Sequence, residues 1–219
     1  MFCVLKHKDQ ATLNPLDLSQ WDFYVLSTAD KKIARRIEHI KAEAIHMKKL
    51  VEDMLVLAKS DSMEKVPLFS KIDFSDIVTN AILVYEPIIF DAKKKLVYHV
   101  QDGLMVMGDR EELQRLVHIL LDNTSKYCPE KGVIRVDLKE SERRRAVLKV
   151  FNEGAPIPRK ELDKIFLRFY RCDESRSGHE SFGLGLAIAQ NIVNMHNGKI
   201  WADSQAESGN TFYVSLPLA

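Results

Sequence analysis

The sequence lacks several features that would define other classes of protein. Its three cysteines, Cys3, Cys128 and Cys172, lie far apart and form no CxxC pair, so they predict neither a disulfide framework nor a zinc site. No apolar run approaches the roughly 20 residues that a membrane-spanning helix needs, and no signal peptide is visible. The 32 basic and 31 acidic residues leave a net charge of +1, which gives no general electrostatic reason to expect nucleic-acid binding.

The composition that is present belongs to a folded chain. Of the 219 residues 46% are hydrophobic and 29% charged, so the chain can bury a core and is not a disordered polymer. The length suits one sizeable domain with an added element, or two small domains. The cysteine pattern favours a reducing, cytosolic compartment, with any membrane-spanning part outside this chain.

Residues 30–60 carry the clearest helical pattern. Apolar residues spaced alternately by four and three form an a/d series, the heptad seam: Ile33, Ile37, Ile40, Ala44, Met47, Val51, Met54 and Ala58. Such a series predicts packing in a coiled coil or a helical bundle. Leu50, Leu55 and Leu57 widen the apolar face, which favours a four-helix bundle completed by a second chain. An ordinary amphipathic core helix is the alternative.

The remaining sequence mixes strand and helix patterns. Residues 61–72 are predicted as a linker, because Ser60-Asp61-Ser62 breaks the seam and Pro67 ends any helix. Helices are expected at 73–85, 110–126 and 181–195, and strands at 21–26, 95–100, 133–138, 146–151, 199–203 and 211–216. This mixture predicts an α+β fold, a sandwich in which helices cover one face of a sheet. The predicted divisions are a dimerisation segment at 1–60 with an atypical 1–30, the linker, and a domain at 73–219.

The run Phe182-Gly183-Leu184-Gly185-Leu186 opens an apolar helix and is the sharpest local pattern. Bare backbone N–H groups at a helix N-terminus attract phosphate, because the unpaired donors and the helix dipole both point at the anion. Glycine lets the chain approach phosphate without a Cβ in the way. A tight turn at the start of a helix is the alternative. No GK[ST] follows, so this is not a Walker A loop, and no strand immediately precedes it as in a dinucleotide-binding unit.

The helix around Leu120–Tyr127 offers polar groups on a mostly apolar surface. The side-chain oxygen of Asn123 suits Mg²⁺, which keeps several waters and bridges phosphates. Lys126 lies three residues on, along the same helical face, and can neutralise a phosphate. Tyr127 can stack on or line a base pocket. The alternative is a helix C-terminus whose lysine complements the dipole.

Two further segments complete the set. Residues 150–158 form a strand that ends in a turn, with the sequence VFNEGAPIP. Residues 165–171, IFLRFYR, interleave aromatic residues with arginines, whose planar and always charged fork suits phosphate. A β-turn and a buried amphipathic turn are the alternatives for the two segments.

In this order the four segments resemble the N, G1, F and G2 boxes of the GHKL ATP-binding fold. Together with the heptad helix they resemble a bacterial two-component sensor histidine kinase, over about Ile33 to Leu218. The resemblance implies a GHKL-type sandwich that binds ATP and Mg²⁺ and passes the γ-phosphoryl group to a histidine, for relay to an aspartate of a response regulator. It also implies a homodimer, a cytosolic location, no nucleic-acid partner, and a membrane reached only through parts outside this chain.

The resemblance also assigns roles to matching residues. Asn123 would hold Mg²⁺, and Lys126 and Tyr127 would contact phosphate and nucleotide. The adenine pocket would be lined by Asn152, Gly154 and Ile157. The phosphates would be held by the arginines and the glycine-rich turn: Arg168, Arg171, Gly183, Leu184, Gly185 and Leu186. Residues 172–180 would form a lid over ATP.

Three positions depart from the family pattern. Asn152 stands where the family has an aspartate, so its amide oxygen accepts the adenine amino group without charge assistance, and weaker adenine binding is expected. Pro156 replaces a glycine and stiffens the turn. Ile119 stands where hydrolytic relatives place a glutamate that activates water; this argues against an efficient ATP hydrolase, although neighbouring Asp122 keeps that point open.

The phosphoacceptor is the weakest match. His7 lies 46 residues before Asp53, close to the expected spacing, yet no acidic residue adjoins it and Lys8 follows it. An adjacent carboxylate would act as the general base that makes imidazole nucleophilic. A nucleotide-binding interaction module that transfers nothing is therefore the second hypothesis. An ATP hydrolase and an anti-sigma-type serine kinase are further alternatives, and neither explains the heptad seam.

Overall fold

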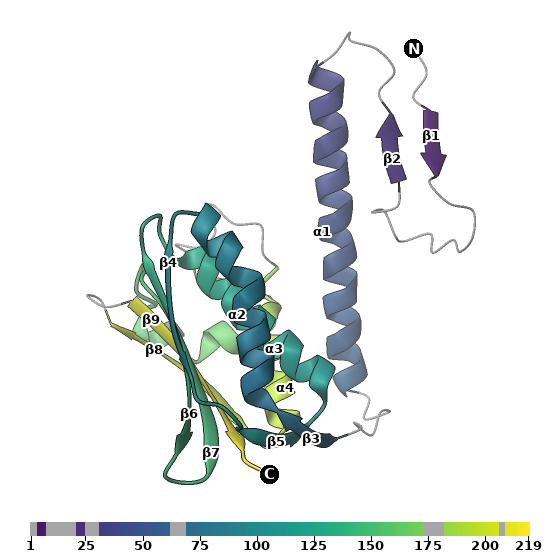
Figure 1. Cartoon of the computed structure of the whole chain (residues 1–219). Coiled ribbons are helices and arrows are strands. Elements are labelled where there is room, and N and C mark those ends of the chain that lie inside the picture. Colours follow the sequence, from purple (N-terminus) through teal and green to yellow (C-terminus); the bar gives the residue numbers. More distant parts are fainter. Residues whose placement is uncertain (1–3, 8–20, 25–30, 62–68, 173–181, 206–208) are drawn as a thin grey trace. The chain divides into compact units, whose positions relative to one another are not determined.

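The computed structural model describes residues 4–7, 21–24, 31–61, 69–172, 182–205 and 209–219 (Figure 1). The chain forms two compact units, Met1–Leu55 and Val56–Ala219. Most of the predicted linker, at 62–68, and the predicted lid residues 173–180 lie outside the described residues. Among the described residues, no helix combines the length and the apolarity needed to cross a bilayer.

The first unit begins with two short strands. β1 (Val4–His7) pairs antiparallel with β2 (Trp21–Tyr24), so the strand predicted near 21–26 is confirmed. In this register His7 lies opposite Trp21. His7 is thus the last residue of a strand, whereas the resemblance expects a phosphoacceptor on a bundle helix.

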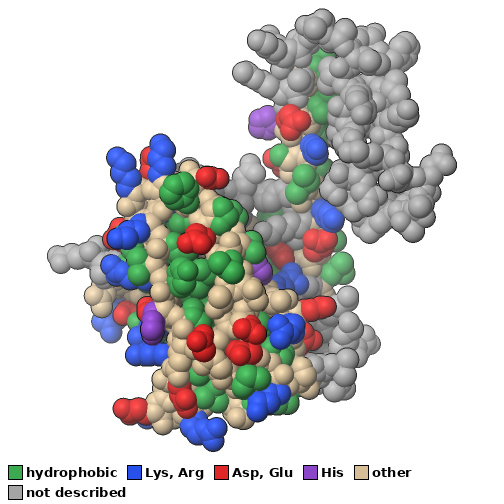
Figure 2. Space-filling model, viewed as in Figure 1, with side chains coloured by type: hydrophobic (Ala, Val, Ile, Leu, Met, Phe, Trp, Pro, Cys, Tyr) green, Lys and Arg blue, Asp and Glu red, His purple; other side chains and the backbone are tan. Residues whose placement is uncertain are grey.

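Helix α1 (Lys31–Asp61) confirms the helix predicted at 30–60. It contains neither proline nor glycine over its 31 residues. Five residues of the heptad seam are exposed, with exposed fractions between 44% and 67%: Ile33, Ile40, Met47, Val51 and Met54. Figure 2 shows hydrophobic side chains at the surface of this helix. The seam is apolar surface that the helix itself has no means of burying.

The second unit is built on a five-stranded sheet in the order β4-β6-β7-β9-β8. Its strands are β4 (Lys95–Val100), β6 (Val133–Ser141), β7 (Arg145–Asn152), β8 (Lys199–Gln205) and β9 (Gly209–Pro217). β4 pairs parallel with β6, and the other three pairings are antiparallel. Helices α2 (Phe74–Asp91), α3 (Arg110–Tyr127) and α4 (Gly185–Met195) lie against one face of the sheet, as Figure 1 shows. The predicted α+β sandwich is confirmed.

Two helix boundaries differ from the prediction. α2 continues beyond Tyr85 and past Pro87, because Ile89 is buried in the core and continued helix keeps it there. Pro87 lies on the exposed face, where the carbonyl of Leu83 that loses its donor can bond to water. α4 begins at Gly185, later than the predicted start near Ser181.

A second, two-stranded sheet was not predicted. β3 (Ser70–Asp73) pairs antiparallel with β5 (Met105–Gly108), and Ile72 lies opposite Val106, both of them buried. β3 therefore occupies residues that were predicted to belong to the linker. The linker prediction was wrong at this end, because the partner strand lies more than 30 residues away and leaves no local pattern.

Two aspartates and one histidine fix the starts of α2 and α3. Asp73 caps α2 and Asp109 caps α3, each accepting two backbone N–H groups of the first turn. His196, at the end of α4, is buried and accepts a hydrogen bond from the Asp109 N–H at 3.0 Å through Nε2. Its Nδ1 lies 2.7 Å from the Ile192 carbonyl oxygen, which fixes the tautomer with the proton on Nδ1. His196 thus ties the end of α4 to the start of α3.

Candidate nucleotide-binding site

Helix α3 carries the first group of predicted site residues. Its buried face consists of Leu113, Leu116, Val117, Leu120, Leu121 and Thr124. Asn123, Lys126 and Tyr127 are half-buried, beside that face and near the C-terminal end of the helix. The packing of the apolar face therefore presents these three side chains at the margin of the core, where a ligand can reach them.

A charged pair lies among these residues. The Lys126 ammonium donates to the Asp122 carboxylate at 2.7 Å, one helical turn apart. Across from it the Tyr85 hydroxyl donates to the His118 carbonyl oxygen at 3.2 Å. Burial, and then the negative charge of Asp122, raise the pKa of Tyr85 to about 12. Asp122 thus holds the lysine that the resemblance assigns to phosphate.

The turn after β7 carries the second group. Asn152 ends the strand and is buried, and its amide nitrogen donates to the Glu153 carbonyl oxygen at 3.0 Å. A Cβ atom at Gly154 would lie 2.7 Å from the carbonyl oxygen of Tyr127. Only glycine permits so close an approach without a shift of the backbone. The structure thus brings the turn of Gly154 against the end of α3.

Two residues that the sequence reasoning missed hold this turn in place. The Ile157 N–H donates to Ser204 Oγ at 2.8 Å and to Asn210 Oδ1 at 3.3 Å. Ser204 Oγ donates to Asn210 Oδ1 at 2.7 Å, and Asn210 Nδ2 donates to the Ala155 carbonyl oxygen at 3.0 Å. One signal was available in the sequence, since Asn210 shares its strand face with buried Phe212 and so implies a buried polar group with partners.

The glycine-rich turn also lies close to α3. Gly183 has φ +70°, and a Cβ there would lie 2.6 Å from the Tyr170 carbonyl oxygen. The Phe169 N–H donates to the Gly183 carbonyl oxygen at 3.0 Å, which ties this turn to the segment of Arg168 and Arg171. A Cβ at Gly185 would lie 3.4 Å from the side chain of Ile119. Two of the predicted segments thus approach α3, at Gly154 and at Gly185, and the segment of Arg168 and Arg171 is joined to the glycine-rich turn.

The N-terminus of α4 is suited to an anion. Leu184 is its N-cap residue and makes no side-chain cap hydrogen bond, in contrast to the aspartates that cap α2 and α3. Leu184 is buried, whereas Gly185 and Leu186 are half-buried. The backbone N–H groups of this first turn, together with the helix dipole, provide donors for phosphate oxygens.

The residues present fit a magnesium ion held mainly through its ligand. Within the described residues, no group of three or more His, Cys, Asp or Glu side chains is placed to hold a metal. The half-buried amide of Asn123 is an oxygen donor of the kind that Mg²⁺ accepts, and this ion commonly combines one or two protein ligands with phosphate and water. Ile119, beside Gly185, has no group able to transfer a proton.

Comparison with known proteins agrees with this arrangement. The family described as histidine kinase-, DNA gyrase B-, and HSP90-like ATPase matches residues 108–219, half of the chain. The chain therefore belongs to this family.

Individual relatives extend the likeness beyond those residues. The sensor protein DltS of Streptococcus agalactiae is 32% identical over 184 residues, which cover 84% of this chain and 46% of that protein. The chain thus spans about half the length of such relatives. The resemblance to sensor histidine kinases is confirmed.

Solved structures share the fold. ShkA, in complex with AMPPNP, has a TM-score of 0.75 and 17% identity, covering 88% of this chain and 40% of that chain. The histidine kinase ThkA, in complex with the response regulator TrrA, has a TM-score of 0.71 and 22% identity, covering 88% of this chain and 53% of that one.

Proposed function

We propose that this chain is the catalytic part of a sensor histidine kinase that binds Mg·ATP around α3. The observation that carries the proposal is the approach of two glycine-containing turns to one helix: Gly154 approaches the backbone of Tyr127, and Gly185 approaches Ile119. The complex of ShkA with AMPPNP supports a nucleotide at this fold. The similarity to the sensor protein DltS supports the interpretation of this chain as a kinase.

In this proposal the protein acts by positioning and by charge. Lys126, Arg168 and Arg171 would neutralise phosphate oxygens, and the first turn of α4 would donate backbone N–H groups to them. Asn123 would hold Mg²⁺, which supplies further charge neutralisation when bound. Asn152 would accept the adenine amino group, with Gly154 and Ile157 lining the base.

The reaction that we propose is a phosphoryl transfer. The bond between the γ-phosphorus and the bridging oxygen breaks, ADP leaves, and a nitrogen–phosphorus bond forms at a histidine ring, whose proton passes to solvent. The phosphoryl group then moves to a carboxylate of a response regulator, a partner supported by the complex of ThkA with TrrA. The acceptor predicted from spacing is His7, and it stays a prediction.

Peptide-level mass spectrometry after incubation with Mg·ATP, under neutral conditions that preserve phosphohistidine, tests this function. We expect one phosphorylated histidine, no transfer by Asn123→Ala, and normal transfer by the control Asn194→Ala, an exposed residue of α4. Phosphate on a histidine other than His7 keeps the kinase and discards that acceptor. ATP binding without phosphate favours the interaction module, and absence of both contradicts the proposal.

The exposed heptad seam of α1 supports a homodimer. Five of its eight residues are 44–67% exposed in one chain, and burying a seam of this kind is what drives helices to associate. The seam of a second copy has the same spacing, so two copies can pair through one two-fold axis. Sedimentation equilibrium of the whole chain tests this proposal, with the mass of a dimer expected at micromolar concentration and the mass of a monomer contradicting it.

A further inference from the structure

The face of the five-stranded sheet that α2, α3 and α4 leave uncovered is strongly basic. Its residues alternate with the buried ones along each strand, and we call it the open face. Its charged side chains are six basic and two acidic ones: Lys95, Arg135, Lys139, Arg145, Lys149 and Lys199 against Asp137 and Asp203. The surplus on this one face exceeds the +1 of the entire chain, so positive charge is concentrated here.

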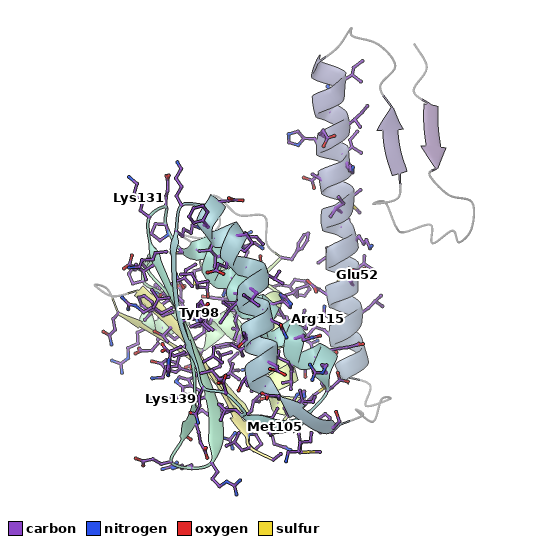
Figure 3. All side chains as sticks on the ribbon, in the orientation of Figure 1. Glu52, Tyr98, Met105, Arg115, Lys131 and Lys139 are labelled. Carbon is purple, nitrogen blue, oxygen red and sulfur yellow. The ribbon has the colours of Figure 1, made fainter. Side chains whose placement is uncertain are left out.

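The figures show the margin of this face. Figure 2 shows Lys and Arg side chains, with Asp and Glu among them, along the margin of the second unit where the sheet lies. Lys139, labelled in Figure 3, extends from β6 on the strand side of the sandwich, away from the helices. The open face is therefore a surface on which an anion meets many cations and few carboxylates.

Three of the cations are held by aromatic rings. The Arg135 guanidinium lies 4.9 Å from the centroid of the Phe151 ring. Lys149 Nζ lies 5.6 Å from the Tyr213 ring and Lys199 Nζ lies 5.7 Å from the Trp201 ring. In the described part of the chain none of these three forms a salt bridge. A ring contact restricts a side chain without neutralising its charge, so these cations are positioned, and only Lys149 has a carboxylate, that of Asp137, directly opposite it in the register.

Two aromatic residues of the open face, Trp201 and Tyr213, stack on each other, which leaves their ring edges for contact with a partner. The rings of Trp201 and Tyr213 are 5.0 Å apart and nearly parallel, with 1° between their planes. Each ring uses one side for the other ring and a lysine approaches each of them, so little ring surface remains for a nucleic-acid base to stack upon. The indole N–H and the phenol O–H are hydrogen-bond donors. Both add to a surface that favours acceptors, of which carboxylates are the strongest.

We propose that the open face is a docking surface for an acidic segment of another protein. Charge complementarity selects the partner: side chains of Asp and Glu match the positioned cations of Arg135, Lys149 and Lys199 and the donors of the ring pair. Five strands about 4.8 Å apart give a flat area roughly 20 Å wide, which suits a protein footprint. Flat, mutually stacked rings are poorly shaped for insertion into a lipid surface.

The test uses the whole chain and a defined probe, poly-L-glutamate, in a nitrogen–proton NMR titration. The indole signal of Trp201, assigned with Trp201→Phe, reports on the open face itself. We expect this signal to shift with poly-L-glutamate and not with poly-L-lysine. In the double variant Lys149→Gln/Lys199→Gln the dissociation constant should rise about tenfold.

A matched control carries the same change of charge elsewhere. Lys71→Gln/Lys160→Gln removes two exposed lysines outside the open face and should alter the dissociation constant less than twofold. Equal weakening by both double variants, or no shift of the Trp201 signal in the natural chain, would overturn the proposal. A shift with phosphatidylserine vesicles and none with poly-L-glutamate would replace the protein partner by a lipid surface, which also overturns it.

Discussion

Helices α1 and α3 are both apolar along one side, and they lie in opposite surroundings. On α3 the apolar residues have exposed fractions of 0–1%: Leu113, Leu116, Val117, Leu120 and Leu121. On α1 the seam residues Ile33, Ile40, Met47, Val51 and Met54 are 44–67% exposed. An apolar stripe predicts that a helix will be buried, and it does not say in which chain the partner lies. α3 finds its partners within the second unit, whereas for the exposed seam of α1 we propose a second copy of the chain as the partner.

The largest effect should come from the buried helix. Leu120→Ala on α3 removes a fully buried side chain, which should lower the free energy of unfolding of the second unit by about 3 to 4 kcal/mol. Ile40→Ala on exposed α1 should change that quantity by about 0.5 kcal/mol or less. Urea denaturation followed by circular dichroism measures both, and similar losses for the two variants would erase the contrast between the helices.

Substitutions in the exposed seam of α1 should change the association of two chains. Ile40→Glu/Met47→Glu places two charges in the heptad seam, and we expect the dimer dissociation constant to rise at least about a hundredfold, or about 2.7 kcal/mol. The urea transition of the second unit should stay where it is. Sedimentation equilibrium gives the first quantity. The control variant Ala42→Glu places a charge at an exposed position outside the seam and should leave the dimer intact.

A smaller effect is expected at the site that α3 supports. Asn152→Asp would replace a neutral acceptor with a charged one, which should tighten ATP binding by about tenfold, or about 1.4 kcal/mol. GTP, which carries a carbonyl where adenine carries its amino group, should gain nothing. Isothermal titration with each nucleotide measures the change. Equal gains for ATP and GTP would mean that residue 152 does not contact the base.

The smallest effect concerns the contact between α2 and α3. Burial and Asp122 raise the pKa of Tyr85 to about 12 from 10.0. The folded state therefore holds this proton more tightly than the unfolded state, and the stability that results is present below about pH 10 and lost as pH rises to about 12. Tyr85→Phe should flatten that decline and cost about 1 kcal/mol at pH 8 through the lost hydrogen bond. Urea midpoints at pH 8 and pH 11 compare the two proteins, and an unchanged slope would contradict the assignment.

The parts of the fold that repeat locally could be predicted. The periods of three to four residues in α1 and α3, and the alternation in β6 and β7, appear in the sequence. The elements predicted from these patterns are confirmed by the structure. The sheet β3–β5 could not be predicted in this way, since its two short strands are stabilised by each other across more than 30 residues. The extension of α2 past Pro87 depends on the burial of Ile89, which is a property of the folded core.

The residues of the candidate site also differ in whether they could be predicted from the sequence. Glycine positions such as Gly154 and Gly183 could be selected from the sequence, because close backbone approach requires that residue type. The position of Asn210 on a buried strand face hints at a polar group with partners, but the partners that Ser204 and Asn210 bond in the turn of Ile157 could not be selected, since they lie about 50 residues away. The pairing of Lys126 with Asp122 is local, four residues apart, and was available in the sequence.

The unbroken course of α1 has a mechanical consequence. A helix of 31 residues without proline or glycine is about 46 Å long and resists twisting, because each turn is bonded to the next. A torque applied at Lys31 would therefore arrive at Asp61 as rotation about the axis, with little lost to bending. Removing one residue would reset the angular phase between the two ends by about 100°, and removing seven would nearly restore it. The number of residues in α1 therefore sets the rotational angle between its two ends.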